Sequence, residues 1–70
     1  VKDAVQGRQI AMYLIRRMTN LSLVDIGREF GGRDHATVKH SIEKVEKQIR
    51  TDPSFAEVIK ELTTNINSKT

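Results

Sequence analysis

Three consecutive residues, Arg33, Asp34 and His35, place a guanidinium, a carboxylate and an imidazole directly after two glycines. If they open a helix, its free backbone N–H groups and its dipole attract anions, phosphate included. In a DNA major groove, Arg33 can pair with guanine or a phosphate, Asp34 can accept from the amino group of cytosine, and His35 can reach a base edge. A structural alternative has equal weight: Asp34 only caps the helix, Arg33 pairs with it, and His35 packs on the first turn.

After His35, apolar and polar residues alternate at the spacing of a helix, so that each kind lies on its own side. One stripe is apolar and consists of Val38, Ile42, Val45 and Ile49. At ~100° per residue, a second set lies within about 70° of the opposite direction. This outward face consists of Ala36, Thr37, His40, Lys44 and Lys47, with Glu43 and Glu46 toward its flank. Small and hydroxylic groups followed by cations suit base edges followed by phosphates, and a solvated helix face is the alternative.

Positive charge gathers in the first part of the chain. Residues 1–50 hold ten bases and six acids, whereas residues 51–70 hold two bases and three acids. This asymmetry indicates an anionic partner, nucleic acid first among them. Arg8 and Gln9 open the first predicted helix and Arg16 lies near its end, which are positions suited to phosphate contacts. Ser22 can donate its hydroxyl to a phosphate as well as cap a helix, and capping is the commoner role.

Several classes of function lack the residues that they need. The sequence has no cysteine, which excludes disulfides and thiolate metal sites. His35 and His40 would point about 140° apart on a helix, so they cannot share a metal ion. There is no G-x-x-x-x-G-K-[ST] phosphate loop, and the longest apolar run, Ile10 to Ile15, is far shorter than the ~20 residues that cross a bilayer. We expect no enzyme activity, no metal site and no membrane segment in this chain.

Apolar spacing predicts helices throughout and no strand. The first helix is expected from Gly7 or Arg8 to Thr19. Its buried stripe consists of Ile10, Leu14 and Met18, widened by Ala11 and Ile15, and Tyr13 is expected in the core with its hydroxyl at the rim.

A short second helix is expected after Ser22, its N-cap, and Asp25 three residues later resembles a capping box. Gly27 lets a neighbouring backbone come close. Gly31-Gly32 ends the helix, because glycine tolerates the left-handed conformation found just past helix ends. The inward side chains are Leu23, Ile26 and Phe30.

The third helix is expected from Asp34, its N-cap, to about Arg50 or Thr51. Asp52-Pro53 predicts a fourth helix, because Asp caps and Pro is tolerated at the first helical position. That helix is expected to bury Phe55, Val58, Ile59, Leu62 and Ile66. The predicted fold is all-α: residues 1–70 form one compact four-helix domain containing a helix-turn-helix, with the third helix as the reader of DNA.

The stretch Gly31-Gly32-Arg33-Asp34-His35-Ala36-Thr37-Val38-Lys39-His40 resembles the signature of the C-terminal DNA-binding domain of the bacterial replication initiator DnaA. The similarity extends upstream through Arg8–Leu14, Thr19–Leu23 and Ile26–Phe30. It covers most of residues 8–50, and the last helix is matched only by its pattern. The chain therefore resembles a family whose domains carry a Trp-repressor-like helix-turn-helix.

The resemblance implies sequence-specific binding to double-stranded DnaA boxes at replication origins, for initiation of chromosome replication. Residues expected at bases are Arg33, Asp34, His35, Ala36 and Thr37. Residues expected at phosphates are Arg8, Gln9, Arg16, Ser22, His40 and Lys44. We expect the fragment to be monomeric, to need no cofactor and to come from a larger cytoplasmic, nucleoid-associated protein. An AAA+ module, absent here, would bind ATP and contact other initiator copies.

Three positions depart from the family pattern. The family often has Thr or Ser at the position of Ala36, so one hydrogen bond to a base is missing and contact with a thymine methyl is left. Gly7 stands where Pro is common, which predicts a looser start of the first helix. A basic arm reaches the minor groove in relatives; its key arginine would fall before Val1 or is missing here, and only Lys2 is nearby.

The sequence is also compatible with two other functions. A dimeric helix-turn-helix regulator of the Trp-repressor type would self-associate and prefer palindromic half-sites. A helical protein-interaction adaptor would bind a partner helix in an apolar groove and would show no salt-dependent affinity for DNA.

Overall fold

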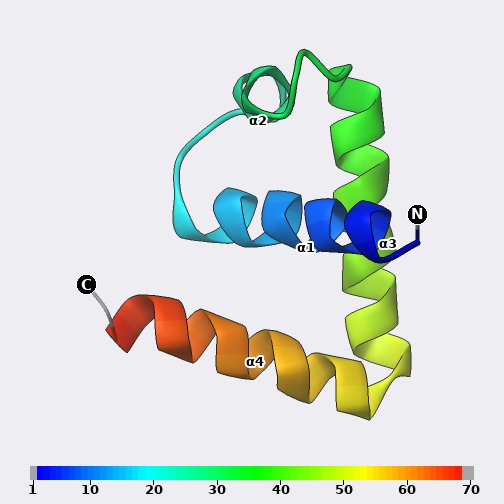
Figure 1. The fold of residues 1–70 in the computed structure, drawn as a ribbon, viewed down its shortest axis with the longest axis vertical. Coiled ribbons are helices and arrows are strands. Elements are labelled where there is room, and N and C mark those ends of the chain that lie inside the picture. The colour runs from blue at the N-terminus through cyan, green and yellow to red at the C-terminus, as the bar shows by residue number, and fades with distance from the viewer. Residues whose placement is uncertain (1, 69–70) are drawn as a thin grey trace.

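The fold consists of four helices, as the computed structural model shows for the backbone of residues 2–68 and the side chains of residues 5–66. They are α1 (Lys2–Met18), α2 (Leu23–Glu29), α3 (His35–Thr51) and α4 (Pro53–Ser68). No strand occurs among the described residues, so the predicted all-α class is confirmed. α3 packs against each of the other helices, and Figure 1 shows α1 crossing it between α2 and α4.

The caps expected from the sequence position α2, α3 and α4. Ser22 Oγ accepts the N–H of Asp25 at 3.1 Å, and Asp34 Oδ1 accepts that of Ala36 at 3.4 Å. Asp52 Oδ1 accepts the backbone N–H of Phe55 at 3.2 Å. Each carboxylate or hydroxyl satisfies a donor that has no partner within its helix. Only one of the two hydrogen bonds of a capping box forms, because the Asp25 carboxylate lies 3.6 Å from Arg28 Nη1 and does not accept the backbone N–H of Ser22.

The start of α1 differs from the prediction. The helix begins at Lys2 and continues through Gly7, where a start was expected. Glycine costs a helix interior only about 1 kcal/mol relative to alanine, so a single glycine does not end a helix whose neighbours favour it. Gly7 is exposed and is a weak point inside α1 rather than its beginning.

The buried core lies where α1, α2 and α3 meet, with one residue from α4. It consists of Met12, Tyr13, Ile26, Val38, Ile42, Val45 and Ile59. The burial of Tyr13 and of Val38, Ile42 and Val45 from the stripe predicted on α3 is thereby confirmed, and Ile49 packs partly buried against this core. On α1, however, the stripe residues Ile10 and Leu14 are only partly buried against this core and Met18 is half-buried, whereas Met12, which the spacing did not select, is buried.

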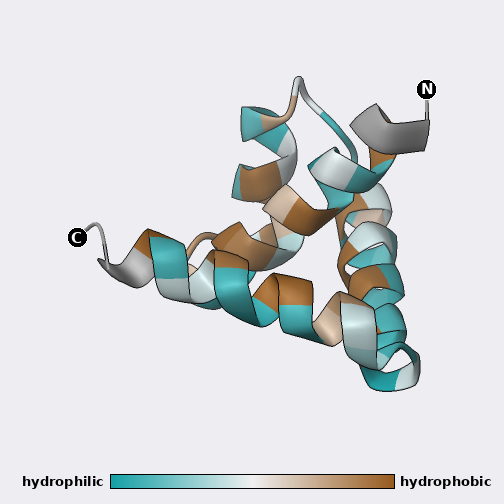
Figure 2. Ribbon diagram, turned by 60° about the horizontal axis from the view of Figure 1, so that its bottom comes forward, coloured by the Kyte–Doolittle hydropathy of each residue, from teal (hydrophilic) through white to brown (hydrophobic). Residues whose placement is uncertain are grey.

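The prediction for α4 was largely wrong. Ile59 is buried and Phe55 is half-buried, whereas Val58, Leu62 and Ile66 are 51%, 38% and 41% exposed. α4 packs mainly on α3, next to the corner at Asp52. Its later turns extend away from that corner (Figure 1), and hydrophobic segments are visible along it in Figure 2. Helical periodicity identified an apolar stripe, but the length of the contact with α3 limits how much of it is covered.

Candidate nucleic-acid interface

The turn between α2 and α3 is held on one backbone oxygen. Gly27 O accepts N–H groups from Phe30, Gly32 and Arg33 at 3.1, 3.0 and 2.9 Å. Gly31 and Gly32 adopt φ of +84° and +78°, which L side chains rarely adopt. The turn signal of Gly31-Gly32 is therefore confirmed, and this turn fixes where α3 begins.

Gly27 brings that turn close to α2. It is buried, and a Cβ built on it would collide with the carbonyl oxygen of Arg33. The predicted close approach of a neighbouring backbone at Gly27 is confirmed. Because the collision is with backbone rather than with a flexible side chain, the path of the chain into α3 depends on the missing Cβ.

The first turn of α3 is open to solvent. All five residues expected at bases, Arg33 through Thr37, are exposed. The structural alternative for this segment holds only in part. Asp34 caps α3, but its carboxylate lies 3.3 Å from His35 Nδ1 rather than pairing with Arg33, and the His35 side chain is 65% exposed instead of packed. Arg33 keeps its guanidinium free of protein partners in the described structure.

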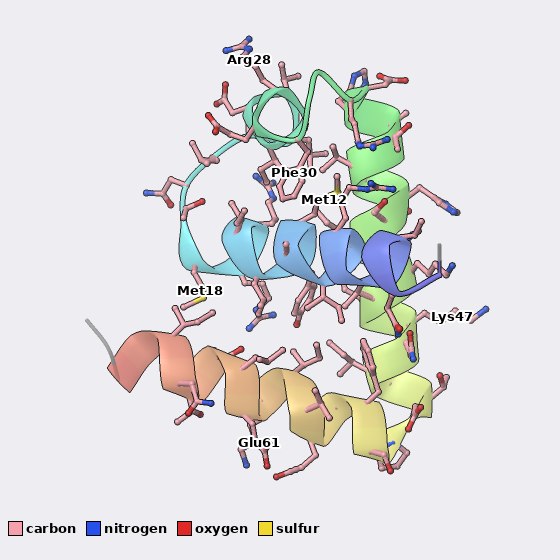
Figure 3. The ribbon with its side chains drawn as sticks, viewed as in Figure 1. Met12, Met18, Arg28, Phe30, Lys47 and Glu61 are labelled. Carbon is pink, nitrogen blue, oxygen red and sulfur yellow. The ribbon has the colours of Figure 1, made fainter. Side chains whose placement is uncertain are left out.

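The outward face of α3 continues this surface. Its members Ala36, Thr37, His40, Lys44 and Lys47 are all exposed, whereas Val38, Ser41, Ile42 and Val45 are buried on the other side. Figure 3 shows Lys47 projecting away from the helices. One helix thus presents small and hydroxylic groups at its start and cations one to three turns later, as its sequence predicted.

The flank of α3 carries a different kind of surface. A shallow hollow is lined by Arg16, Leu23, Lys39, Ile42, Glu43 and Glu46. Arg16 Nη1 donates to the backbone oxygen of Leu21 at 2.8 Å, which ties the end of α1 to the loop before α2. Arg16, expected at a phosphate, therefore also has a local structural role and shares its hollow with two carboxylates. Lys39 lies beside it and was given no role from the sequence.

The remaining phosphate candidates lie on α1 and at the start of α2. Arg8 and Gln9 are half-buried in the second turn of α1. Ser22 is exposed, and its hydroxyl oxygen accepts the capping bond from Asp25. A hydroxyl that accepts in a cap retains its own hydrogen for donation. Ser22 can therefore cap and donate to a phosphate at the same time.

In the described part of the chain, no three His, Cys, Asp or Glu side chains are grouped so that they could hold a metal ion. None of the helices found in it combines the length and the apolar character needed to cross a bilayer.

The exposed start of α3, fixed by a glycine turn, agrees with a comparison of the sequence with protein families. Residues 1–45 match the family described as "Bacterial dnaA protein helix-turn-helix". The chain belongs to this DnaA family. The match covers α1, α2 and α3 as far as Val45 and leaves out α4.

Individual relatives extend the agreement over most of the chain. The chromosomal replication initiator protein DnaA of Symbiobacterium thermophilum is 55% identical over 62 residues, which is 89% of this chain and 14% of the relative. That of Lachnoclostridium phytofermentans is 58% identical over 60 residues, which is 86% of this chain and 13% of the relative. The chain therefore spans about one-seventh of these DnaA proteins. No solved structure matches it.

Proposed function

We propose that this domain binds specific double-stranded DNA, the DnaA boxes of a replication origin, and so contributes to initiation of chromosome replication. The observation that carries the proposal is the exposed first turn of α3, where Arg33 and His35 stand on a turn that Gly27 and two left-handed glycines hold in place. The named relatives are chromosomal replication initiators, which supports the same function.

Base recognition is assigned to the start of α3. In a major groove, the guanidinium of Arg33 fits guanine, and the carboxylate of Asp34 accepts from the amino group of cytosine. Ala36 offers only a methyl group, which suits contact with a thymine methyl. The complete set of proposed base contacts is Arg33, Asp34, His35, Ala36 and Thr37.

Affinity is assigned to phosphate contacts around this helix. Cations that neutralise phosphates release counterions, so binding weakens as salt rises. Lys44 and His40 are exposed on the same face as Thr37, which supports a role for them at phosphates beside the proposed base contacts. The complete set of proposed phosphate contacts is Arg8, Gln9, Arg16, Ser22, His40 and Lys44.

The domain is proposed to act by recognition rather than by turnover. It would bind DNA as a monomer and without a cofactor, in the cytoplasm and at the nucleoid. In a whole initiator, ATP and contacts with other copies would belong to an AAA+ module outside these residues. A dimeric regulator would instead show a self-association constant and a preference for palindromic sites, which sedimentation of the free domain and of its complex measures.

Fluorescence anisotropy tests the function directly. The domain is titrated into a DnaA-box duplex and into a scrambled duplex of the same composition, over a series of salt concentrations. We expect the box to bind more tightly at every salt concentration and both affinities to fall as salt rises. Equal affinity for the two duplexes would contradict specific recognition, and salt-independent binding would contradict the phosphate contacts.

A further inference from the structure

The carboxylate of Asp34 uses one oxygen for both of its contacts. Asp34 Oδ1 accepts the backbone N–H of Ala36 at 3.4 Å and lies 3.3 Å from His35 Nδ1. The side chains of His35 and Asp34 are 65% and 66% exposed, so both are open to solvent.

The position of Nδ1 beside a carboxylate bears on where the imidazole carries its hydrogen. An ionised carboxylate only accepts, and a neutral imidazole has one N–H and one nitrogen lone pair. With the hydrogen on Nδ1, a positive end faces Asp34 Oδ1. With the hydrogen on Nε2, a lone pair would face that negative oxygen at 3.3 Å. The contact therefore favours the Nδ1–H tautomer and leaves Nε2 as an acceptor.

We propose that Asp34 is a positioning residue for His35: it favours the Nδ1–H tautomer, so that Nε2 accepts a hydrogen bond from a DNA base. The major groove offers only two kinds of base donor, the N6 amino group of adenine and the N4 amino group of cytosine. The opposite tautomer would donate, and would meet guanine O6 or N7, adenine N7 or thymine O4 instead. This inference rests on the proposed function for its DNA partner, but not for the tautomer itself.

The tautomer can be measured in the free domain. Long-range ¹H–¹⁵N NMR spectra distinguish the two ring nitrogens at about pH 8.5, where imidazole side chains are ordinarily neutral. We expect the Nδ1–H form of His35 to predominate in the wild-type domain. The Asp34→Ser variant keeps a good N-cap but removes the carboxylate, and its His35 should shift toward the Nε2–H form. A tautomer ratio that is the same in both proteins would overturn the role of Asp34.

The same spectra contain their own control. His40 lies on the outward face of α3, and no carboxylate contact is found for it in the described structure. Its tautomer ratio should be unchanged by Asp34→Ser. A circular-dichroism spectrum equal to that of the wild type would show that the variant keeps its helices. If His40 shifted together with His35, the effect would be structural and the proposal would fail.

The base partner is tested on a DnaA-box duplex in which amino groups are removed one at a time, adenine being replaced by purine and cytosine by 2-pyrimidinone. We expect one replacement to weaken wild-type binding by about 5- to 10-fold, the loss expected for a single base hydrogen bond. The same replacement should not change DNA binding by the His35→Ala variant. If every replacement weakens both proteins equally, the amino-group assignment fails. If the wild type does not distinguish the unmodified box from a scrambled duplex, the proposed function fails with it, whereas the NMR result still decides the role of Asp34.

Discussion

The backbone N–H of Arg33 donates to the carbonyl oxygen of Gly27 at 2.9 Å, and a Cβ on Gly27 would collide with the Arg33 carbonyl. The N–H group and the carbonyl oxygen of Arg33 thus both lie next to Gly27 of α2. The proposed base contacts begin at Arg33. The start of α3 is therefore positioned by a buried glycine of α2.

Gly27→Ala should destabilise the domain because its methyl group has no room beside the Arg33 backbone. Overpacking of this kind typically costs about 1–3 kcal/mol, and urea unfolding followed by circular dichroism measures it. Gly7→Ala is the matched control, since nothing lies within 4 Å of a Cβ at Gly7. There the same substitution should stabilise by about 0.5–1 kcal/mol, because alanine is the better helix former. Equal effects of both substitutions would contradict the close approach at Gly27.

Gly31→Ala should destabilise for a different reason. A Cβ at Gly31 has nothing within 4 Å, but φ is +84°. The loss should be about 1–2 kcal/mol, the cost of a side chain in the left-handed conformation. Gly31→Asn should lose less, because asparagine tolerates that conformation. Thermal or urea unfolding of the two Gly31 variants distinguishes backbone strain from side-chain crowding. An asparagine variant that is as unstable as the alanine variant would argue against backbone strain.

The features that could be predicted from the sequence act over a few residues. Ser22, Asp34 and Asp52 each cap the helix that follows, because a capping side chain reaches an N–H two or three positions away. The glycine pair ends α2 by the same local logic. The outward face of α3 was predictable because helical periodicity fixes which side chains oppose the apolar stripe.

The features that could not be predicted depend on how helices cross. Met12 is buried because α1 lies between α2 and α4, as Figure 3 shows by placing Met12 and Met18 on opposite sides of it. Periodicity along α1 does not contain that arrangement. In the candidate site, neither the contact of Asp34 with His35 nor that of Arg16 with the Leu21 carbonyl follows from spacing alone. Both depend on rotamers and on loop geometry.

Because α4 is only partly covered, substitutions at two neighbouring residues should destabilise the domain by different amounts. Ile59 is 5% exposed and Val58 is 51% exposed. Ile59→Ala should cost about 2–4 kcal/mol because it leaves a cavity in the core. Val58→Ala should cost less than about 1 kcal/mol, because most of its side chain is already in water. Urea midpoints compare the two, and similar losses would mean that α4 is covered on both faces.

His35→Ala should weaken specific binding while leaving non-specific binding nearly unchanged. The side chain is 65% exposed, so its loss should change stability by less than about 0.5 kcal/mol. Loss of one base contact typically costs about 1–3 kcal/mol on the specific site alone. Anisotropy on a DnaA-box duplex and on a scrambled duplex measures both. Equal losses on the two duplexes would remove His35 from the base-contacting set.

Lys44→Ala should weaken binding to both duplexes, because a phosphate contact carries no sequence information. The slope of log affinity against log salt should fall by about one, the contribution of a single neutralised phosphate. Lys60→Ala is the matched control: it removes the same charge from an exposed position on α4. Figure 1 shows α4 separated from the start of α3 by α1. If the slope fell equally in both variants, net charge alone would account for the effect. A fall confined to Lys44→Ala would place that side chain at a phosphate, since long-range attraction alone cannot distinguish two lysines of one small domain.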